Sequence, residues 1–276
     1  MSSSAPPQPG GAAPARWPPW FGPLALILGL VVGNLLGAIA AALIPGGIHG
    51  STLSPAATDV ATVIQDLGFV AAAVLLARRV GAVHPSQFGL LAPRSLWRAI
   101  GLIVAAGVLF TLVSDVYFVA AHSTGQEKSF VKSIGGNAGT LGVLAVCGLT
   151  TVVAPICEEF LFRGFMFRAL ANWHGPWLAA AITAILFGLV HGLSAPAIDL
   201  APLAFLGFVL CALYYLSGSL YPCIALHAIN NALALSGDES WGTGRTLALL
   251  LGSLAVLAVV FALVRLASER WTPAPG

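Results

Sequence analysis

The stretch LGVLAVCGLTTVVAPICEEFLFR, residues 141–163, places two adjacent glutamates, Glu158 and Glu159, at the end of a long apolar run. A charged side chain at the centre of a bilayer costs about 2.5–3.5 kcal/mol on insertion scales. Charged residues inside such segments usually serve a function, so this pair is the first candidate for a functional site.

The composition of the whole chain predicts the class of protein. Of its 276 residues, 58% are hydrophobic and only 8% are charged, whereas soluble domains carry about 25% charged residues. We therefore expect an all-α, polytopic membrane protein whose surroundings are the lipid bilayer. The net charge is +2 and the basic residues are scattered, so they form no stripe that would bind nucleic acid.

Apolar runs long enough to cross a bilayer recur along the chain and predict a bundle of about eight transmembrane helices. No soluble segment is long enough to build its own core, so residues 21–267 are expected to form one domain. Residues 1–20 are predicted to be a disordered tail with Trp17 and Trp20 at the membrane interface, and residues 268–276 a short C-terminal tail. The predicted spans are 21–44, 56–78, 97–121, 139–162, 176–193, 199–216, 219–236 and 244–267.

The distribution of basic residues predicts the orientation. With eight spans both termini lie on one side, and that side collects nine of the twelve Lys and Arg residues. The positive-inside rule therefore puts both termini in the cytoplasm, and the Glu158–Arg163 segment at the cytoplasmic end of the fourth span. The alanine- and proline-rich composition is typical of GC-rich bacterial genomes, which favours the cell membrane as the location.

Two later spans carry polar groups that lipid-facing helices would exclude. The fifth span contains Phe187 and His191, and the seventh contains His227, Asn230 and Asn231. Polar groups in apolar helices turn inward and meet one another or water. We therefore expect a polar cavity within the membrane, suited to acid–base catalysis or to a metal ion.

Helical geometry separates the two glutamates, because adjacent residues point about 100° apart and residues four apart share a face. Glu159 can pair with Arg163, which leaves two roles open to it, a structural one and direct catalysis. Glu158 has no such partner and is free to face the cavity. Pro155 removes the hydrogen bond to the carbonyl of Thr151, and the resulting kink would widen that cavity.

The seventh span presents a histidine and an amide together. His227 and Asn231 are four residues apart and share a face. Asn230 is three residues from the histidine and is a neighbour too, so the choice between the two amides stays open.

These residues resemble the motif set of the CPBP intramembrane proteases, which include type II CAAX prenyl endopeptidases and bacterial Abi proteins linked to bacteriocin immunity. The resemblance rests on Glu-Glu-x-x-x-Arg at 158–163, Phe-x-x-x-His at 187–191 and His-x-x-x-Asn at 227–231, in that order. It covers roughly residues 139–236.

The resemblance implies an eight-helix endopeptidase that cuts peptide or membrane-protein substrates in a cavity open to the cytoplasm. Glu158 would activate the attacking water, and His191 would help to hold it. His227 and Asn231 would stabilise the oxyanion, while Glu159 and Arg163 would support the site.

The metal requirement has two alternatives. The chain has no His-Glu-x-x-His pair, but Glu158, His191 and His227 could ligate zinc and leave one position open for water. The family is commonly called a metalloprotease family, and a metal-free glutamate mechanism is also argued for it. Both routes are compatible with the sequence.

Two other classes of function are also considered. A non-catalytic membrane protein, such as an immunity factor that sequesters a peptide, would use the polar residues as a hydrogen-bond network. A proton-coupled transporter would use glutamate and histidine as a proton relay, but the chain shows none of the internal repeats that are common in such proteins.

Overall fold

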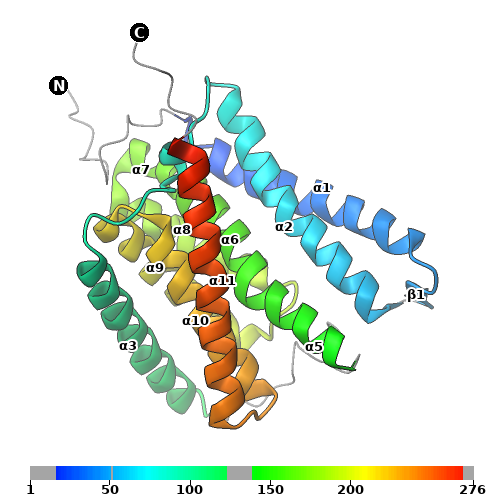
Figure 1. Cartoon of the computed structure of the whole chain (residues 1–276). Coiled ribbons are helices and arrows are strands. Elements are labelled where there is room, and N and C mark those ends of the chain that lie inside the picture. Colours follow the sequence, from blue (N-terminus) through cyan, green and yellow to red (C-terminus); the bar gives the residue numbers. More distant parts are fainter. Residues whose placement is uncertain (1–16, 51, 123–138, 270–276) are drawn as a thin grey trace, which may run out of the picture.

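The computed structural model describes residues 17–50, 52–122 and 139–269, and these form a helical bundle (Figure 1). Seven of its long helices are α1 (Phe21–Leu43), α2 (Pro55–Arg78), α3 (Leu96–Ala120), α8 (Pro176–His191), α9 (Leu200–Ser217), α10 (Leu220–Asp238) and α11 (Thr243–Glu269). The shorter elements are β1 (Ile48–His49), β2 (Thr52–Leu53), and the single helical turns η1 (Pro85–Phe88) and η4 (Ala197–Asp199). The two strands form a small antiparallel hairpin between α1 and α2.

The eighth long helix runs without interruption from Gly139 to His174 and carries the glutamate pair. It consists of α5 (Gly139–Gly148), a π-helical segment η2 (Leu149–Val153), α6 (Ala154–Glu159), a second π-helical segment η3 (Phe160–Phe167) and α7 (Arg168–His174). Segments of π-helix within α-helices are rare and occur frequently at functional sites. Here they flank Glu158 and Glu159 on both sides.

The all-α, polytopic membrane class predicted from the composition is confirmed. Within the described residues, six helices are long and apolar enough to cross a membrane. They are α1, α2, α3, the helix 139–174, the segment Ala197–Ser217 and α11 over Thr243–Ala267. Of the other two predicted spans, α8 is an apolar helix of only 16 residues, and α10 carries the polar residues His227, Asn230 and Asn231.

The end predicted for the fourth span is wrong. The helix extends past residue 162 to His174, where Gly175 has a φ of 82° and Pro176 begins α8. It continues through Arg163 and Gly164 because Glu159 neutralises the arginine, and after Gly139 the next glycine with a positive φ is Gly175. Glu158 therefore lies in the interior of a 36-residue helix rather than at its cytoplasmic end.

The longer helix also changes the count of basic residues from which the orientation in the membrane was predicted. Arg163 and Arg168 are buried inside the bundle rather than in a loop, so they do not report on orientation. Lys128 and Lys132, on the opposite side of the count, fall outside the described residues. The placement of both termini in the cytoplasm stays a prediction.

Trp17 differs from its expected place in a tail at the membrane interface. It is buried, and its ring centroid lies 4.9 Å from that of Phe88 and 4.7 Å from that of Phe165. Burying a large aromatic ring is worth more than leaving it at an interface, because such a ring removes about 150–250 Å² from solvent. Residues 1–16 of the expected tail lie outside the described part of the chain.

The helices α1 and α2 pack closely because one face of α1 is built from glycine. Gly29, Gly33 and Gly37 recur every fourth residue, and a Cβ atom at these positions would meet α2 at 2.5 to 3.0 Å. Small residues at this spacing let two membrane helices approach until their backbones touch. The pair α1–α2 lies along one side of the bundle (Figure 1).

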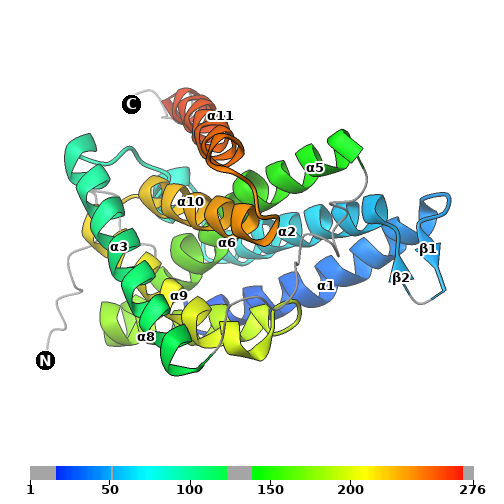
Figure 2. The ribbon, with the colours of Figure 1, turned by 90° about the horizontal axis from the view of Figure 1, so that it is seen from below.

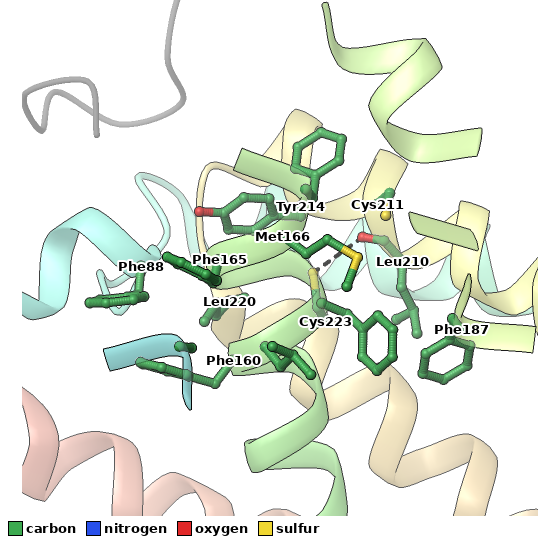
Figure 3. Close-up of a cluster of buried hydrophobic side chains, with 14 of the residues drawn as sticks. Phe88, Phe160, Phe165, Met166, Phe187, Leu210, Cys211, Tyr214, Leu220 and Cys223 are labelled. Atoms are coloured by element: carbon green, nitrogen blue, oxygen red, sulfur yellow. Dashed lines mark hydrogen bonds between the residues drawn. The ribbon is translucent and has the colours of Figure 1, made fainter. Parts of the chain in front are cut away.

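The hydrophobic core surrounds η3 and the helices that cover it. Figure 3 shows Phe160, Phe165 and Met166 of η3 among side chains from η1, α8, α9 and α10. In contrast, α3 and α11 lie at the edge of the bundle (Figure 2) and expose most of their surface. The centre of the molecule is therefore the segment from η2 to α10, and the polar residues predicted to form a site all lie there.

Candidate active site

Glu159 and Arg163 form the ion pair expected from their spacing. The Nη1 atom of Arg163 donates to Oε1 of Glu159 at 2.7 Å, and both side chains are fully buried. The other guanidinium nitrogen, Nη2, donates to the carbonyl oxygen of Gly207 in α9 at 2.9 Å. Two charges removed from water in this way are stable only as a pair with further hydrogen bonds.

Phe187 completes the surroundings of the guanidinium group. Its ring centroid lies 4.6 Å from Cζ of Arg163, a distance typical of a cation–π interaction. The same ring contacts the imidazoles of His191 and His227 at centroid distances of 4.6 and 5.8 Å. Phe187 of α8 therefore separates the ion pair from the open side of the site.

His227 is held by the same glutamate. Its Nδ1 lies 2.9 Å from Oε1 of Glu159, and the carboxylate there already accepts a hydrogen bond from Arg163. A carboxylate only accepts, so Nδ1 of His227 carries the hydrogen. Nε2 is therefore the nitrogen of His227 that faces Glu158. A carboxylate that orients an imidazole in this way occurs in many catalytic sites.

His191 is fixed by its own helix. Its Nδ1 lies 2.7 Å from the carbonyl oxygen of Phe187, one turn earlier in α8. Because a carbonyl oxygen only accepts, Nδ1 carries the hydrogen here too. The Nε2 atom of a neutral His191 is then a hydrogen-bond acceptor.

Glu158 points toward both histidines. Its Oε2 lies 4.0 Å from Nε2 of His191 and 3.9 Å from Nε2 of His227. That oxygen is buried and has no hydrogen-bond partner among the described residues, while the side chain as a whole is 17% exposed. Three groups that can accept protons thus converge on one small region.

Asn231 ties α10 to the π-helical segment η2. Its Nδ2 donates to the carbonyl oxygen of Thr150 at 3.0 Å. In η2 the amide of Ala154 bonds to Leu149, five residues back, so the carbonyl left free by Pro155 is that of Thr150. The α-helical spacing expected from the sequence points to the carbonyl of Thr151, and this expectation is wrong because η2 is π-helical.

Asn230 lies beside Asn231 and donates from Nδ2 to its Oδ1 at 3.3 Å. Both amides are half-buried. Asn231 therefore makes the contact between helices, and Asn230 supports it. Contacts join six of the residues singled out from the sequence, and Asn230 and Asn231 lie one helical turn beyond His227 in α10. The six are Glu158, Glu159, Arg163, Phe187, His191 and His227.

The three residues considered as zinc ligands do not fit a zinc ion as they lie. Ligand atoms at the usual bond lengths of about 2.0–2.1 Å stand about 3.3 Å apart around a tetrahedral zinc. The separations of 3.9 and 4.0 Å from Oε2 of Glu158 to the two imidazoles are wider than this. Within the described ranges, no group of three His, Cys, Asp or Glu side chains is arranged to hold a metal ion.

A further carboxyl group near the site was missed from the sequence. Asp66 in α2 is only 4% exposed and interacts electrostatically with Glu158. An acidic residue within an apolar span was the signal that could have identified it.

The comparison with protein families points the same way as the motifs. Residues 140–233, about a third of the chain, match the family model described as type II CAAX prenyl endopeptidase Rce1-like. No curated protein and no solved structure matches the chain. The matched segment contains every motif residue from Glu158 to Asn231, and the family suggested by those motifs is thereby confirmed. Residues 140–233 are therefore similar to the Rce1-like type II CAAX prenyl endopeptidases.

Proposed function

We propose that this protein is an intramembrane endopeptidase in which Glu158 activates a water molecule to hydrolyse peptide bonds. The observation that carries the proposal is the buried, unpartnered Oε2 of Glu158 facing Nε2 of both His191 and His227. The family match supports an endopeptidase of the CAAX-protease type in general.

The spacing of these atoms suits one water molecule. Hydrogen bonds between oxygen and oxygen or nitrogen are about 2.7–3.0 Å long, so groups 3.9 to 4.0 Å apart can both contact a single water between them. Glu158 and a neutral His191 would each accept one of its hydrogens. The water oxygen then keeps its lone pairs for attack on a peptide carbonyl.

In the proposed reaction the water oxygen bonds to the carbonyl carbon while its proton passes to Glu158. The carbonyl oxygen becomes an oxyanion. Glu158 then returns the proton to the peptide nitrogen, the C–N bond breaks, and the products are a carboxyl group and an amine. The single carboxylate of Glu158 therefore serves first as the base and then as the acid.

His227 would stabilise the oxyanion as a cation. Its Nδ1 hydrogen is directed to Glu159, so Nε2 can donate only when the ring carries both hydrogens. That form also balances charge, because two carboxylates, Glu158 and Glu159, are then offset by Arg163 and the imidazolium. Uncompensated charge in a membrane interior is costly, so the balanced state is favoured. The remaining Nδ2 hydrogen of Asn231 is the second candidate donor.

The substrate would be a peptide or a membrane protein that reaches the site from the cytoplasmic end of the bundle. This orientation is supported by the seven Lys and Arg residues that remain on that side when the buried Arg163 and Arg168 are left out, and the location in the cell membrane is supported by the composition. Metal dependence is an outcome to be measured, with both routes considered from the sequence as alternatives.

Cleavage of a quenched-fluorescence peptide library by the purified full chain in nanodiscs tests the proposal. Glu158→Gln keeps the size of the side chain but removes the base, and we expect it to lower the rate by about 10²- to 10⁴-fold. Glu239→Gln, in the turn after α10, is the matched control and is expected to leave the rate unchanged. A chelator arm with zinc added back reports on metal dependence.

Cleavage that survives Glu158→Gln would overturn the proposed role of this residue. A well-folded protein that cleaves no peptide of the library, yet binds one of them with the same affinity after the substitution, would favour the peptide-sequestering alternative.

A further inference from the structure

Two aspartates of α2 lie on the same interior face of the bundle. Asp59 and Asp66 are seven residues apart, so on a helix they point within about 20° of one another. The face of α2 that carries Asp66 packs against α6, next to Cys157 and Glu158. The same helix also contacts η2 and α5.

Both aspartates carry one oxygen to which no group in the described part of the chain donates a hydrogen bond. Oδ1 of Asp59 and Oδ2 of Asp66 are buried and have no hydrogen-bond partner among the described residues, like Oε2 of Glu158. Asp66 is only 4% exposed, whereas Asp59 is half-buried. Buried polar groups are hydrogen-bonded to protein or to ordered water, so these three oxygens require water.

The three oxygens follow one another in space from the hairpin end of the bundle to the candidate active site. Asp59 lies just after the first turn of α2, beside the β1–β2 hairpin, and Asp66 lies about 10 Å further along the helix. The hairpin and the first turns of α2 and α5 lie at the same end of the bundle (Figures 1 and 2). Beyond Asp66 comes Glu158.

We propose that Asp59 and Asp66 hold a chain of water molecules along α2, and that this chain supplies water to Glu158 from the hairpin end of the bundle. Hydrolysis consumes one water in each turnover, and a site inside a membrane needs a route for it. Asp66 is a positioning residue of this route and does not touch the substrate. The inference rests on the proposed function only in that Glu158 uses the water.

The chain offers a matched pair of control positions. Val60 and Leu67 each follow one of the aspartates and share the same seven-residue spacing, but they point about 100° away. They are 38% and 56% exposed and lie on the outer surface of the bundle. Depth along α2 is therefore nearly equal for the two pairs, and only the face of the helix differs.

Cysteine accessibility tests the route directly. Single variants D59C, T62C, D66C, V60C and L67C are treated in nanodiscs with a charged thiol reagent, and modification is followed by mass spectrometry. Thr62 lies between the aspartates on their face, and the four native cysteines are buried, so the unsubstituted chain provides the blank. Such reagents attack the thiolate, which forms in water.

We expect D59C, T62C and D66C to react at least about tenfold faster than V60C and L67C, because a thiol in lipid stays protonated. The rates should fall in the order D59C, T62C, D66C, since water enters at the hairpin end. Equal rates on the two faces would overturn the route, and the reverse order would overturn the point of entry.

A kinetic arm separates this inference from the proposed function. Asp66→Leu should lower kcat about tenfold with KM unchanged, and Asp66→Asn, whose amide still binds water, should restore most of it. Unchanged kcat in Asp66→Leu would contradict a role in water supply. If no peptide is cleaved at all, the proposed function fails while the thiol reactions still decide whether the route exists.

Discussion

The two adjacent glutamates occupy opposite halves of the site. The closed half consists of Glu159, Arg163 and Nδ1 of His227, which are buried and joined by hydrogen bonds of 2.7 and 2.9 Å. The open half consists of Glu158 and the two Nε2 atoms, which stand 3.9 to 4.0 Å apart. One residue along a helix, about 100° of rotation, converts a structural carboxylate into one available for chemistry.

The difference between the two halves predicts that substitutions in one change stability and substitutions in the other change activity. The closed half fixes ring orientation and compensates charge, so its loss should be felt in folding. The open half makes few contacts, so its loss should be felt in turnover. Substitutions in each half of the site test this division of roles.

The largest effect on stability is expected from Arg163→Leu. This substitution leaves Glu159 buried without its cation, and breaking a buried ion pair costs about 3–5 kcal/mol. Unfolding in detergent, followed by circular dichroism against denaturant, measures the loss. The double variant Glu159→Gln with Arg163→Met should recover much of it, and equal instability of the two variants would contradict charge as the cause.

A smaller effect is expected from Asn231→Leu. The carbonyl of Thr150 loses its donor, and hydrogen bonds between membrane helices are worth about 0.6 kcal/mol on average and at most about 1.7. We expect a loss near the upper limit, because Pro155 leaves this carbonyl no other backbone partner. Asn230→Leu is the control and should cost less in the same unfolding measurement. A larger cost for Asn230→Leu would reverse the assignment of the two amides.

The smallest effect on stability is expected from Glu158→Gln, the substitution expected to abolish turnover. Because Oε2 of Glu158 has no hydrogen-bond partner within residues 17–50, 52–122 and 139–269, the free energy of unfolding should change by no more than about 0.5 kcal/mol. A thermal unfolding midpoint in the same nanodiscs measures it. Strong destabilisation would assign Glu158 to the framework and remove the contrast between the two halves.

Much of the fold could be predicted because glycine, proline and capping residues mark the helix ends. Pro55 and Ser54 begin α2, and Gly175 with Pro176 separates α7 from α8, all within one or two residues of the expected positions. The ion pair of Glu159 and Arg163 also followed from spacing alone. Local rules of this kind depend only on neighbours in the sequence.

What could not be predicted depends on partners in space. The π-helical spacing before Pro155 moved the free carbonyl by one residue, and α10 supplied its donor through Asn231. The length of the helix 139–174 depended on the neutralisation of Arg163. Asp66 could be noticed as an acidic residue within an apolar span, but its closeness to Glu158 on another helix is not encoded in the sequence of α2.

The short helix α8 has a consequence for the surrounding lipid. Its 16 residues span only about 24 Å, less than the hydrocarbon thickness of about 30 Å of a typical bilayer. A bilayer meets such a mismatch by thinning around the protein. The head groups beside the turn after His191 would then be drawn inward on this side of the protein alone, because longer helices such as α3 and α11 match a bilayer of ordinary thickness. The membrane would be shallowest where the imidazole lies.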